Sequence, residues 1–86
     1  MSWELIWTRP ALQDMRRLDH QTAVRIRRGV LRLSEADEGD VRRLQGKTPA
    51  EWALRVGDWR VRFAYDFQAR TIRVLRVLPR GRAYRD

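Results

Sequence analysis

The sequence predicts an α+β fold in which two N-terminal helices pack on a twisted, mostly antiparallel four-stranded sheet, in the order β-α-α-β-β-β. Two patterns lead to this class. Apolar residues recur three and four positions apart in the first part of the chain, as on one face of a helix, and alternate with other residues later, as in a strand. The 86 residues contain no linker and no repeat, so we expect a single domain spanning 1–86.

A strand and a short helix are expected at the N-terminus. Residues 3–7 are rich in aromatic and β-branched side chains, which favours a strand. Thr8 can cap the helix that follows, and Pro10 falls in its first turn, where the missing N–H costs nothing. On this helix we expect Ala11, Met15 and Leu18, helped by Leu12, to be buried, and Asp14, Arg16 and Arg17 to face water.

A second, longer helix is expected from about Asp19, whose side chain can act as its N-cap. The helix fades into an acidic connection, residues 34–40, that contains Gly39. The carboxylates of this connection lack the spacing of a metal-binding loop, so we interpret it as a solvated loop. The expected buried stripe is Ala23, Ile26, Val30 and Leu33, and the expected solvated side is Arg25, Arg28 and Arg32.

Three further strands are expected in the second half, after turn residues 44–49. Residues 52–56 form the first of them. Residues 59–67 carry an apolar side chain at every odd position, which is the period of a strand with one buried face. Residues 72–78 are more continuously apolar, which indicates a central strand covered on both faces. The tryptophans are expected to fill the core or cover its edge: Trp3, Trp7, Trp52 and Trp59.

Positive charge dominates the composition, and it is unevenly distributed. The net charge is +8, of which residues 1–43 carry +2 and the rest of the chain +6. A concentrated excess of this kind predicts nucleic acid or an acidic protein as the partner. Almost all the basic residues are Arg, which the base composition of a genome can also produce, but composition alone does not decide where the arginines lie.

The composition also excludes several kinds of chemistry. A chain without Cys has no disulfide, thiol nucleophile or Cys-ligated zinc. His20, the single histidine, cannot form a triad or an ordinary His-based metal site, so we expect no cofactor. No apolar run approaches the roughly 18 residues of a membrane span, and no secretion signal is recognisable. We therefore expect a cytoplasmic protein with no membrane partner.

The strongest candidate site is a hairpin with several arginines. Residues 56–59, Val-Gly-Asp-Trp, have Gly at the first central position of a two-residue loop, which suits a type II′ turn. The resulting register puts Arg55 directly opposite Arg60, with Arg62 on the same face. Like charges there destabilise a hairpin unless carboxylates or a bound polyanion offset them, and on that strand only Asp66 shares the face. We therefore hypothesise a phosphate-binding face; the alternative is a solvated face with outward arginines.

The C-terminal residues 79–85 add three arginines around Tyr84. A base can stack on a tyrosine while arginines hold the flanking phosphates, a combination used for single-stranded RNA. A frayed basic tail on the surface is the alternative interpretation.

Segments spread over essentially the whole chain carry a family resemblance. They are the leading strand, the Ala-Leu-x-Asp-Met-x-x-Leu pattern of the first helix, residues 44–46, residues 52–61 with the core Arg-Val-Gly-Asp-Trp-Arg, and Arg80 followed four residues later by Tyr84. Together they resemble the RelE/ParE superfamily of bacterial type II toxins. The fold of that superfamily, two helices on a twisted and mostly antiparallel sheet, matches the order of elements predicted above.

The resemblance implies a toxin that is neutralised by a co-expressed antitoxin. RelE-like members enter the ribosomal A site and cut mRNA, whereas ParE-like members poison DNA gyrase. Carried over by position, the implied functional residues are Arg55 at a basic sheet site, Arg60 at the Arg of the family's Gly-x-Tyr-Arg pattern, which reads Gly-Asp-Trp-Arg here, Arg80 after the last strand, and Tyr84 as the C-terminal tyrosine. Ala53 stands where some active members have Lys, and Pro79 where many have His, so the capacity for general base catalysis is reduced.

Cleavage of RNA through its 2′-hydroxyl needs a proton acceptor and positive charge around the phosphate. Arginine supplies the charge, but with a pKa above about 12 it is a poor base, which leaves Tyr84 as the candidate base. We therefore predict a ribosome-dependent mRNA endoribonuclease in which Arg60 and Arg80 clamp the scissile phosphate and Tyr84 activates or stacks. The predicted substrate-binding residues are Arg55, Arg62 and Arg82.

Two other functions remain open at this stage. A ParE-like toxin would inhibit DNA gyrase by binding it, without catalysis, and Ala53 together with the missing His favours that alternative. A non-toxic basic module that binds RNA or DNA needs only the arginine face. A small acidic antitoxin gene beside this one would support either toxin and argue against the third function.

Overall fold

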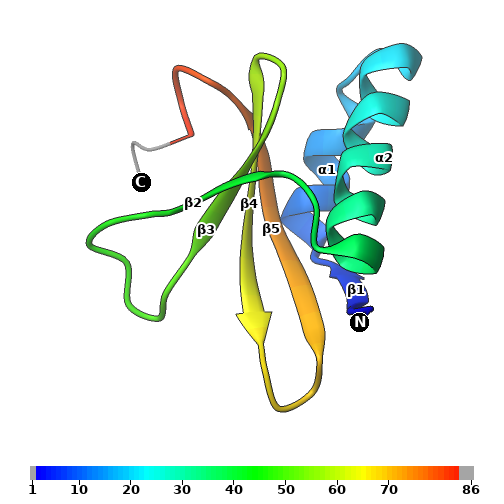
Figure 1. Cartoon of the computed structure of the whole chain (residues 1–86). Helices are drawn as coiled ribbons and strands as arrows, with labels where there is room; N and C mark the ends of the chain where they lie inside the picture. The colour runs from blue at the N-terminus through cyan, green and yellow to red at the C-terminus, as the bar shows by residue number, and fades with distance from the viewer. Residues whose placement is uncertain (1, 84–86) are drawn as a thin grey trace.

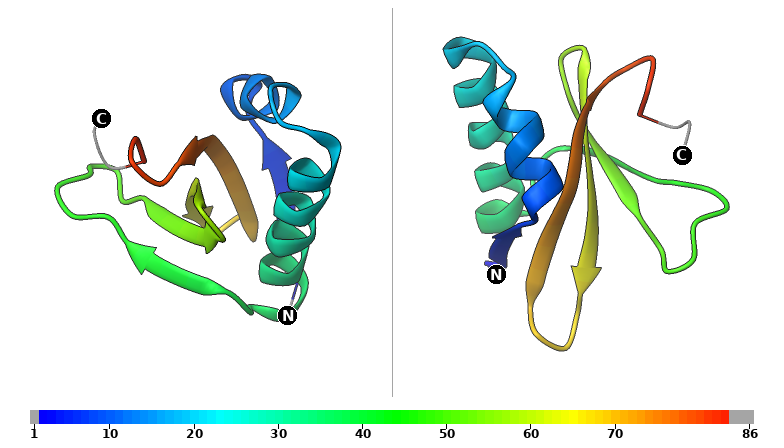
Figure 2. Two further views of the ribbon diagram at one scale, coloured as in Figure 1. Left: turned by 90° about the horizontal axis from the view of Figure 1, so that it is seen from above. Right: turned by 180° about the vertical axis from the view of Figure 1, so that it is seen from behind.

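The computed structural model describes residues 2–83, which form two helices on one side of a five-stranded sheet (Figure 1). The strand order is β1-β5-β4-β3-β2; β1 pairs with β5 in parallel, and the other neighbours are antiparallel. Both helices cover the same face of the sheet, and no helix covers the opposite face (Figure 2). The elements are β1 Glu4–Trp7, α1 Arg9–Arg16, α2 His20–Ala36, β2 Asp40–Arg43, β3 Trp52–Val56, β4 Trp59–Asp66 and β5 Thr71–Pro79.

The α+β class is confirmed, but the expected number of four strands is wrong. The additional strand is β2, which begins at the end of the segment expected to be a solvated acidic connection. It pairs with β3, with Asp40 opposite Arg55 and Val41 opposite Leu54. Only Val41 is apolar in β2, and its neighbours are exposed, so the strand has almost no alternation that a pattern could reveal. Hydrogen bonding to β3, rather than its own sequence, defines this edge strand.

The two helices begin differently from each other. Asp19 caps α2 as expected, because its Oδ2 accepts a hydrogen bond from the backbone N–H of Thr22 at 3.1 Å. Thr8 precedes α1, but its side chain does not cap the helix. The Thr8 hydroxyl instead donates to the carbonyl oxygen of Val74 at 2.7 Å, so it fastens the start of α1 to β5.

The hydrophobic core lies between the helices and the covered face of the sheet. Ile26, Val30 and Leu33 of α2 are buried as predicted, while Ala23 is half-buried. The tryptophans are half-buried and pack against the core at its margin. The buried sheet residues that meet the helices are Leu54, Val56, Val61, Phe63, Ile72, Val74 and Val77.

β5 lies between β1 and β4, which confirms it as an inner strand. We expected the apolar run of β5 to reflect burial on both faces. Arg73 is exposed, however, so the run has another cause. Phe63 pairs with Val74 and Arg62 with Arg76, so Leu75 is an extra residue without a partner in β4. A bulge of this kind shifts the alternation by one position. As a result the buried side chains Val74 and Val77 are three residues apart rather than two.

α1 departs most from the sequence-based expectation. Leu12, expected to help bury the helix, is 45% exposed, whereas Asp14, expected to face water, is only 8% exposed. Asp14 Oδ2 accepts hydrogen bonds from Arg76 Nε and from the backbone N–H of Val77, both at 2.8 Å. β1 pairs with β5 only as far as Val74. Beyond Val74, this edge of β5 has no neighbouring strand and lies beside α1 instead. Asp14 therefore satisfies a backbone donor that no strand reaches.

Candidate nucleic-acid interface

The register predicted for the β3–β4 hairpin is confirmed. Arg55 lies opposite Arg60, Ala53 opposite Arg62, and Gly57 in the turn has a φ of 58°, a conformation that favours glycine. All three arginines lie on strand positions that alternate with the core residues, on the face that carries no helix. Two strands therefore bring a set of guanidinium groups onto one open sheet surface.

Arg60 and Arg62 are not free in solvent, in contrast to the alternative of a fully solvated face. Arg60 is 8% exposed, and its Nη1 donates to the carbonyl oxygens of Gly57 at 3.0 Å and Trp59 at 2.9 Å. Arg62 is 7% exposed, and its Nε and Nη2 both donate to Glu51 Oε1, at 3.1 and 2.7 Å. Arg55 alone of these three is exposed. Charge repulsion in the hairpin is thus offset by carbonyl dipoles and one carboxylate.

The carboxylate that offsets Arg62 is one that the sequence pattern did not single out. Asp66, the acid expected to share the face, is exposed, and its Oδ1 accepts the backbone N–H of Ala69 in the following turn. Glu51 lies just before β3, where a strand pattern does not predict which way it points. The sequence did contain one signal of this pairing. Glu51 lies two residues before Ala53, the cross-strand partner of Arg62, and residues two apart in an extended chain point to the same side.

A cavity of about 250 Å³ opens beside the hairpin. Arg55 and Arg60, which lie opposite each other in the hairpin, line it, and Ala53 forms part of its wall. Arg42 and Asp40 of β2 line it as well, and both were missed because β2 itself was missed. The cavity therefore combines three guanidinium groups with one carboxylate, a composition suited to an anionic group such as phosphate.

The segment after β5 returns to the tip of the hairpin. The backbone N–H of Arg80 donates to the carbonyl oxygen of Asp58 at 2.8 Å, and that of Arg82 donates to Pro79 at 2.9 Å in a turn. The residues Arg80 and Arg82 are both exposed. The hairpin tip and this turn thus bring Arg80 to the same end of the sheet as Arg60. Tyr84, the predicted base, lies outside the described residues.

Trp52 and Trp59 are not part of the arginine surface. Trp59 packs at the margin of the core, on the face that the helices cover. The ring of Trp52 contacts that of Tyr65 edge-on, with centroids 4.8 Å apart, and Arg43 lies over its face at 5.9 Å. Both residues therefore act as predicted, filling the core or covering its edge.

Within residues 2–83, no group of three or more His, Asp or Glu side chains is arranged to hold a metal ion. In the same part of the chain, no helix is both long and apolar enough to cross a bilayer.

The fold and the arginine surface together define a class: small basic α+β proteins with helices on one face of the sheet and an open cationic face on the other. The family model described as the ParE toxin of the type II toxin-antitoxin system, parDE, matches residues 5–84, and the chain therefore belongs to this family of toxins within the RelE/ParE superfamily. No curated protein matches the sequence.

Solved structures with the same fold come from archaea and bacteria. The archaeal RelE-RelB complex from Pyrococcus horikoshii matches with a TM-score of 0.78 and 23% identity, covering 96% of this chain and 100% of that one. The toxin-antitoxin complex RelBE2 from Mycobacterium tuberculosis gives 0.68 and 19%, covering 93% and 100%. The RelB-RelE antitoxin-toxin complex from Methanococcus jannaschii gives 0.72 and 18%, covering 93% and 95%. At these identities the likeness is one of fold.

Proposed function

We propose that this toxin is a ribosome-dependent mRNA endoribonuclease that inhibits translation in the cytoplasm. The observation that carries the proposal is the cavity lined by Arg42, Arg55 and Arg60 on the open sheet face, with Arg80 at the same end of the sheet. An RNA strand offers closely spaced phosphates, and the guanidinium fork matches their oxygens. Arg42, Arg55 and Arg60 lie on strands, which hold them in fixed relative positions, as catalysis by positioning requires.

Each arginine has a distinct role in this proposal. Arg60 and Arg80 stabilise the negative charge that develops on the scissile phosphate. Arg55, exposed at the rim, positions the substrate backbone, and Arg82 is a supporting contact. Arg60 is held through Nη1 by two carbonyl oxygens, which orients its guanidinium group in advance of substrate binding. Arg62 has a structural role: its ion pair with Glu51 holds the segment that leads into β3 in place.

Removal of the 2′-hydroxyl proton is assigned to Tyr84, which activates this oxygen or stacks on a base. As the 2′-oxygen bonds to phosphorus, the bond from phosphorus to the 5′-oxygen breaks, and water supplies the proton to that leaving oxygen. Among the described residues that line the cavity, Asp40 has the only side chain that can accept a proton at neutral pH. The two candidates are separable by substitution: Tyr84→Phe abolishes cleavage if the tyrosine is the base, and Asp40→Asn does so if the aspartate is.

A second candidate function is inhibition of DNA gyrase by protein binding. The matched family model describes a ParE toxin, and Ala53 and Pro79 stand where the resemblance to RelE-like toxins leads us to expect Lys in some members and His in many, which reduces the capacity for general base catalysis. In that case the arginine surface would bind protein rather than RNA, and substitution of Tyr84 would leave toxicity unchanged.

The partner in the cell is proposed to be a cognate antitoxin, in line with the RelB-bound state of the structural relatives. The test uses purified toxin with two targets, ribosomes programmed with a defined mRNA and DNA gyrase in a supercoiling assay. Cleavage of mRNA only on the ribosome supports the proposal. Loss of supercoiling without mRNA cleavage supports the gyrase alternative.

A further inference from the structure

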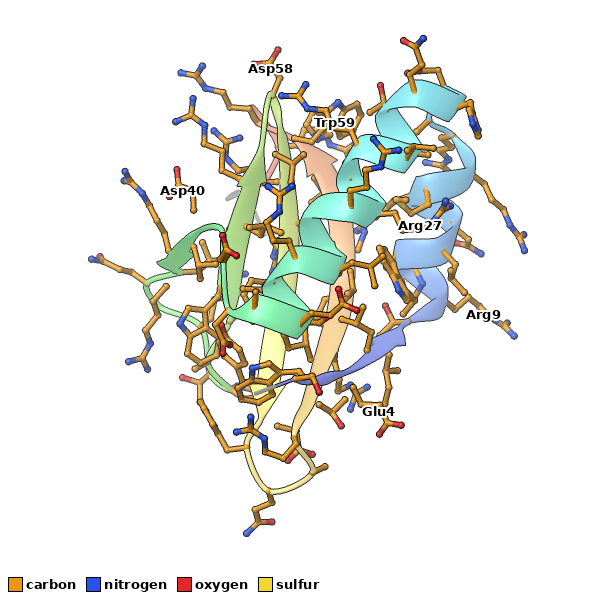
Figure 3. All side chains as sticks on the ribbon, turned by 45° about the vertical axis from the view of Figure 1, so that its right-hand side comes forward. Glu4, Arg9, Arg27, Asp40, Asp58 and Trp59 are labelled. Atoms are coloured by element: carbon orange, nitrogen blue, oxygen red, sulfur yellow. The ribbon has the colours of Figure 1, made fainter. Side chains whose placement is uncertain are left out.

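Three aromatic rings gather at the end of the sheet opposite the arginine cavity. Figure 3 shows the hairpin tip at Asp58 at one end of the sheet and the turn between β4 and β5 at the other. Trp3 precedes β1, Tyr65 lies near the end of β4, and Phe67 follows β4 in the turn. We call these three residues, together with Arg70 of the same turn, the aromatic platform.

The rings of the aromatic platform form a short stack that ends in solvent. Phe67 lies over Tyr65, with ring centroids 5.4 Å apart and planes at 28°. Trp3 meets both at steeper angles, with its centroid 4.8 Å from that of Tyr65 and 5.6 Å from that of Phe67. Tyr65 is half-buried, but Phe67 is 65% exposed. A ring with that exposure cannot have both faces covered, so the outer face of Phe67 is open to another flat ring.

Arg70 adds a positive charge to the aromatic platform. Its guanidinium carbon lies over the ring of Trp3, 4.3 Å from the centroid. This contact uses the flat face of the guanidinium group, so the N–H donors, which lie in the plane of the group, remain available to phosphate oxygens. Within residues 2–83, the guanidinium of Arg70 forms no ion pair.

The turn that carries Phe67 and Arg70 is held by its backbone. Asp66 Oδ1 accepts the N–H of Ala69 at 3.1 Å, and the carbonyl oxygen of Arg70 accepts the N–H of Glu4 at 2.8 Å. Arg70 has a φ of 54°, in the left-handed region where glycine is favoured. The geometry of the turn therefore does not itself select arginine at this position.

We propose that the aromatic platform binds an unpaired base of single-stranded RNA, which stacks on the outer face of Phe67 while Arg70 holds an adjacent phosphate. Aromatic rings with arginines beside them bind single-stranded nucleic acid with little regard to sequence. The chain neighbours of Phe67, Asp66 and Gln68, are polar and exposed. An exposed ring in such surroundings suits a base better than a protein, because a protein interface needs a contiguous apolar centre.

The aromatic platform is separate from the arginine cavity. Arg60 and Phe67 are seven positions apart, which in an extended strand is about 20 Å. A base on Phe67 therefore lies far from the phosphate that Arg60 contacts. The platform thus contributes to affinity for the RNA target and leaves the chemical step unchanged. This inference rests on the proposed function for RNA as the target and adds a second contact to it.

The experiment compares the affinity of the purified toxin for two single-stranded oligomers of about eight nucleotides, measured by fluorescence anisotropy. One oligomer carries adenine at every position, and the other has the same phosphates but no bases. Contacts to phosphate, including those of the arginine cavity, are common to both oligomers, so the difference in affinity measures stacking. We expect the wild type to bind the adenine oligomer about tenfold more tightly than the abasic one.

Three variants separate the ring from its surroundings. Phe67→Leu keeps an apolar side chain but removes the ring, and is expected to lose the preference for the adenine oligomer while binding the abasic one as before. Arg70→Gly suits the positive φ, so the turn is retained, and is expected to bind both oligomers about threefold more weakly. Leu12→Ala, at a 45% exposed position on α1, is the control and is expected to keep the wild-type preference. Urea unfolding establishes that each variant is folded.

A preference for the adenine oligomer that survives in Phe67→Leu overturns the proposal and assigns stacking to another ring. Equal binding of the two oligomers by the wild type also overturns it, and makes Phe67 a candidate contact for a protein instead. On programmed ribosomes, Phe67→Leu is expected to raise KM about tenfold at unchanged kcat. A fall in kcat, or an unchanged KM, contradicts a role in target affinity. Absence of mRNA cleavage by the wild type refutes the proposed function, whereas a preference for the adenine oligomer carried by Phe67 would still establish the platform as an RNA site.

Discussion

Glu51 holds Arg62 through one carboxylate oxygen, which accepts hydrogen bonds from both Nε and Nη2 of the guanidinium group. The pair is largely withdrawn from water, with side-chain exposures of 9% for Arg62 and 20% for Glu51. A guanidinium committed in this way has little capacity left for a phosphate. The arginine surface therefore divides into members that maintain the structure and members that are available to a substrate.

Arg62→Ala is expected to lower stability and to leave RNA binding nearly unchanged. Removal of the guanidinium leaves the Glu51 carboxylate without its partner, at a cost of about 1–3 kcal/mol. Urea unfolding and RNA titration measure the two effects. Exposed Arg73→Ala is the control, with no expected loss of stability. A tenfold loss of RNA affinity at unchanged stability would show that Arg62 binds substrate directly.

Arg55→Ala is expected to have the opposite effect. Arg55 is exposed and lies between Arg60 and Asp40 on the two neighbouring strands, so its removal loses one repulsion and one attraction and stability stays nearly unchanged. Cleavage of ribosome-bound mRNA is expected to fall at least about tenfold, since one phosphate contact is lost. Arg9→Ala, at an exposed position on α1, is the matched control. Full cleavage by the Arg55 variant would remove this residue from the proposed site.

Asp14→Ala is expected to destabilise the toxin by about 2–3 kcal/mol, because it leaves the buried backbone N–H of Val77 without an acceptor and breaks the contact with Arg76. For a domain of this size, each kcal/mol lowers Tm by about 4–8 °C. Thermal unfolding measures the effect, and exposed Asp58→Ala serves as the control. An unchanged Tm for the Asp14 variant would mean that water replaces the carboxylate at the open edge of β5.

Tyr65 is expected to make the free energy of unfolding depend on pH in the alkaline range. Burial among aromatic rings raises the pKa of Tyr65 above its ordinary value of 10.0, and the negative charge of Asp37 adds to the effect. Because the unfolded chain loses this proton first, the contribution of Tyr65 is fully present below about pH 10 and decreases as the pH rises through the folded pKa. Urea unfolding at several alkaline pH values is expected to show that the free energy of unfolding decreases less steeply with pH for Tyr65→Phe than for the wild type. Identical slopes for the variant and the wild type would refute this.

The sequence allowed the hairpin of the arginine surface to be predicted down to its register. The Gly at position 57 set the turn, and strict alternation set the faces, so the pairing of Arg55 with Arg60 followed. Local patterns of this strength are rare elsewhere in the chain. β2 was missed because one apolar residue, Val41, gives no alternation, and Arg42 was missed with it.

The burial of Asp14 and that of Arg62 went unpredicted for a common reason. Both side chains are charged and lie on positions that a pattern assigns to solvent, yet both are buried by partners far away in sequence or outside the strand. Asp14 can accept the backbone N–H of Val77 only because β1 ends before this part of β5 and leaves its edge without a neighbouring strand. Such pairings depend on the lengths of neighbouring elements, which are the least predictable feature of a sequence.

The most direct test of the account is primer extension on an abundant translated mRNA, minutes after this toxin is induced alone in a bacterial host. The account predicts discrete cuts that disappear when translation initiation is blocked and that are absent from Arg60→Ala and Tyr84→Phe variants. Growth arrest without mRNA cuts, accompanied by a DNA damage response and filamentation, would contradict it. The arginine surface would then be a protein-binding surface, with DNA gyrase as its target.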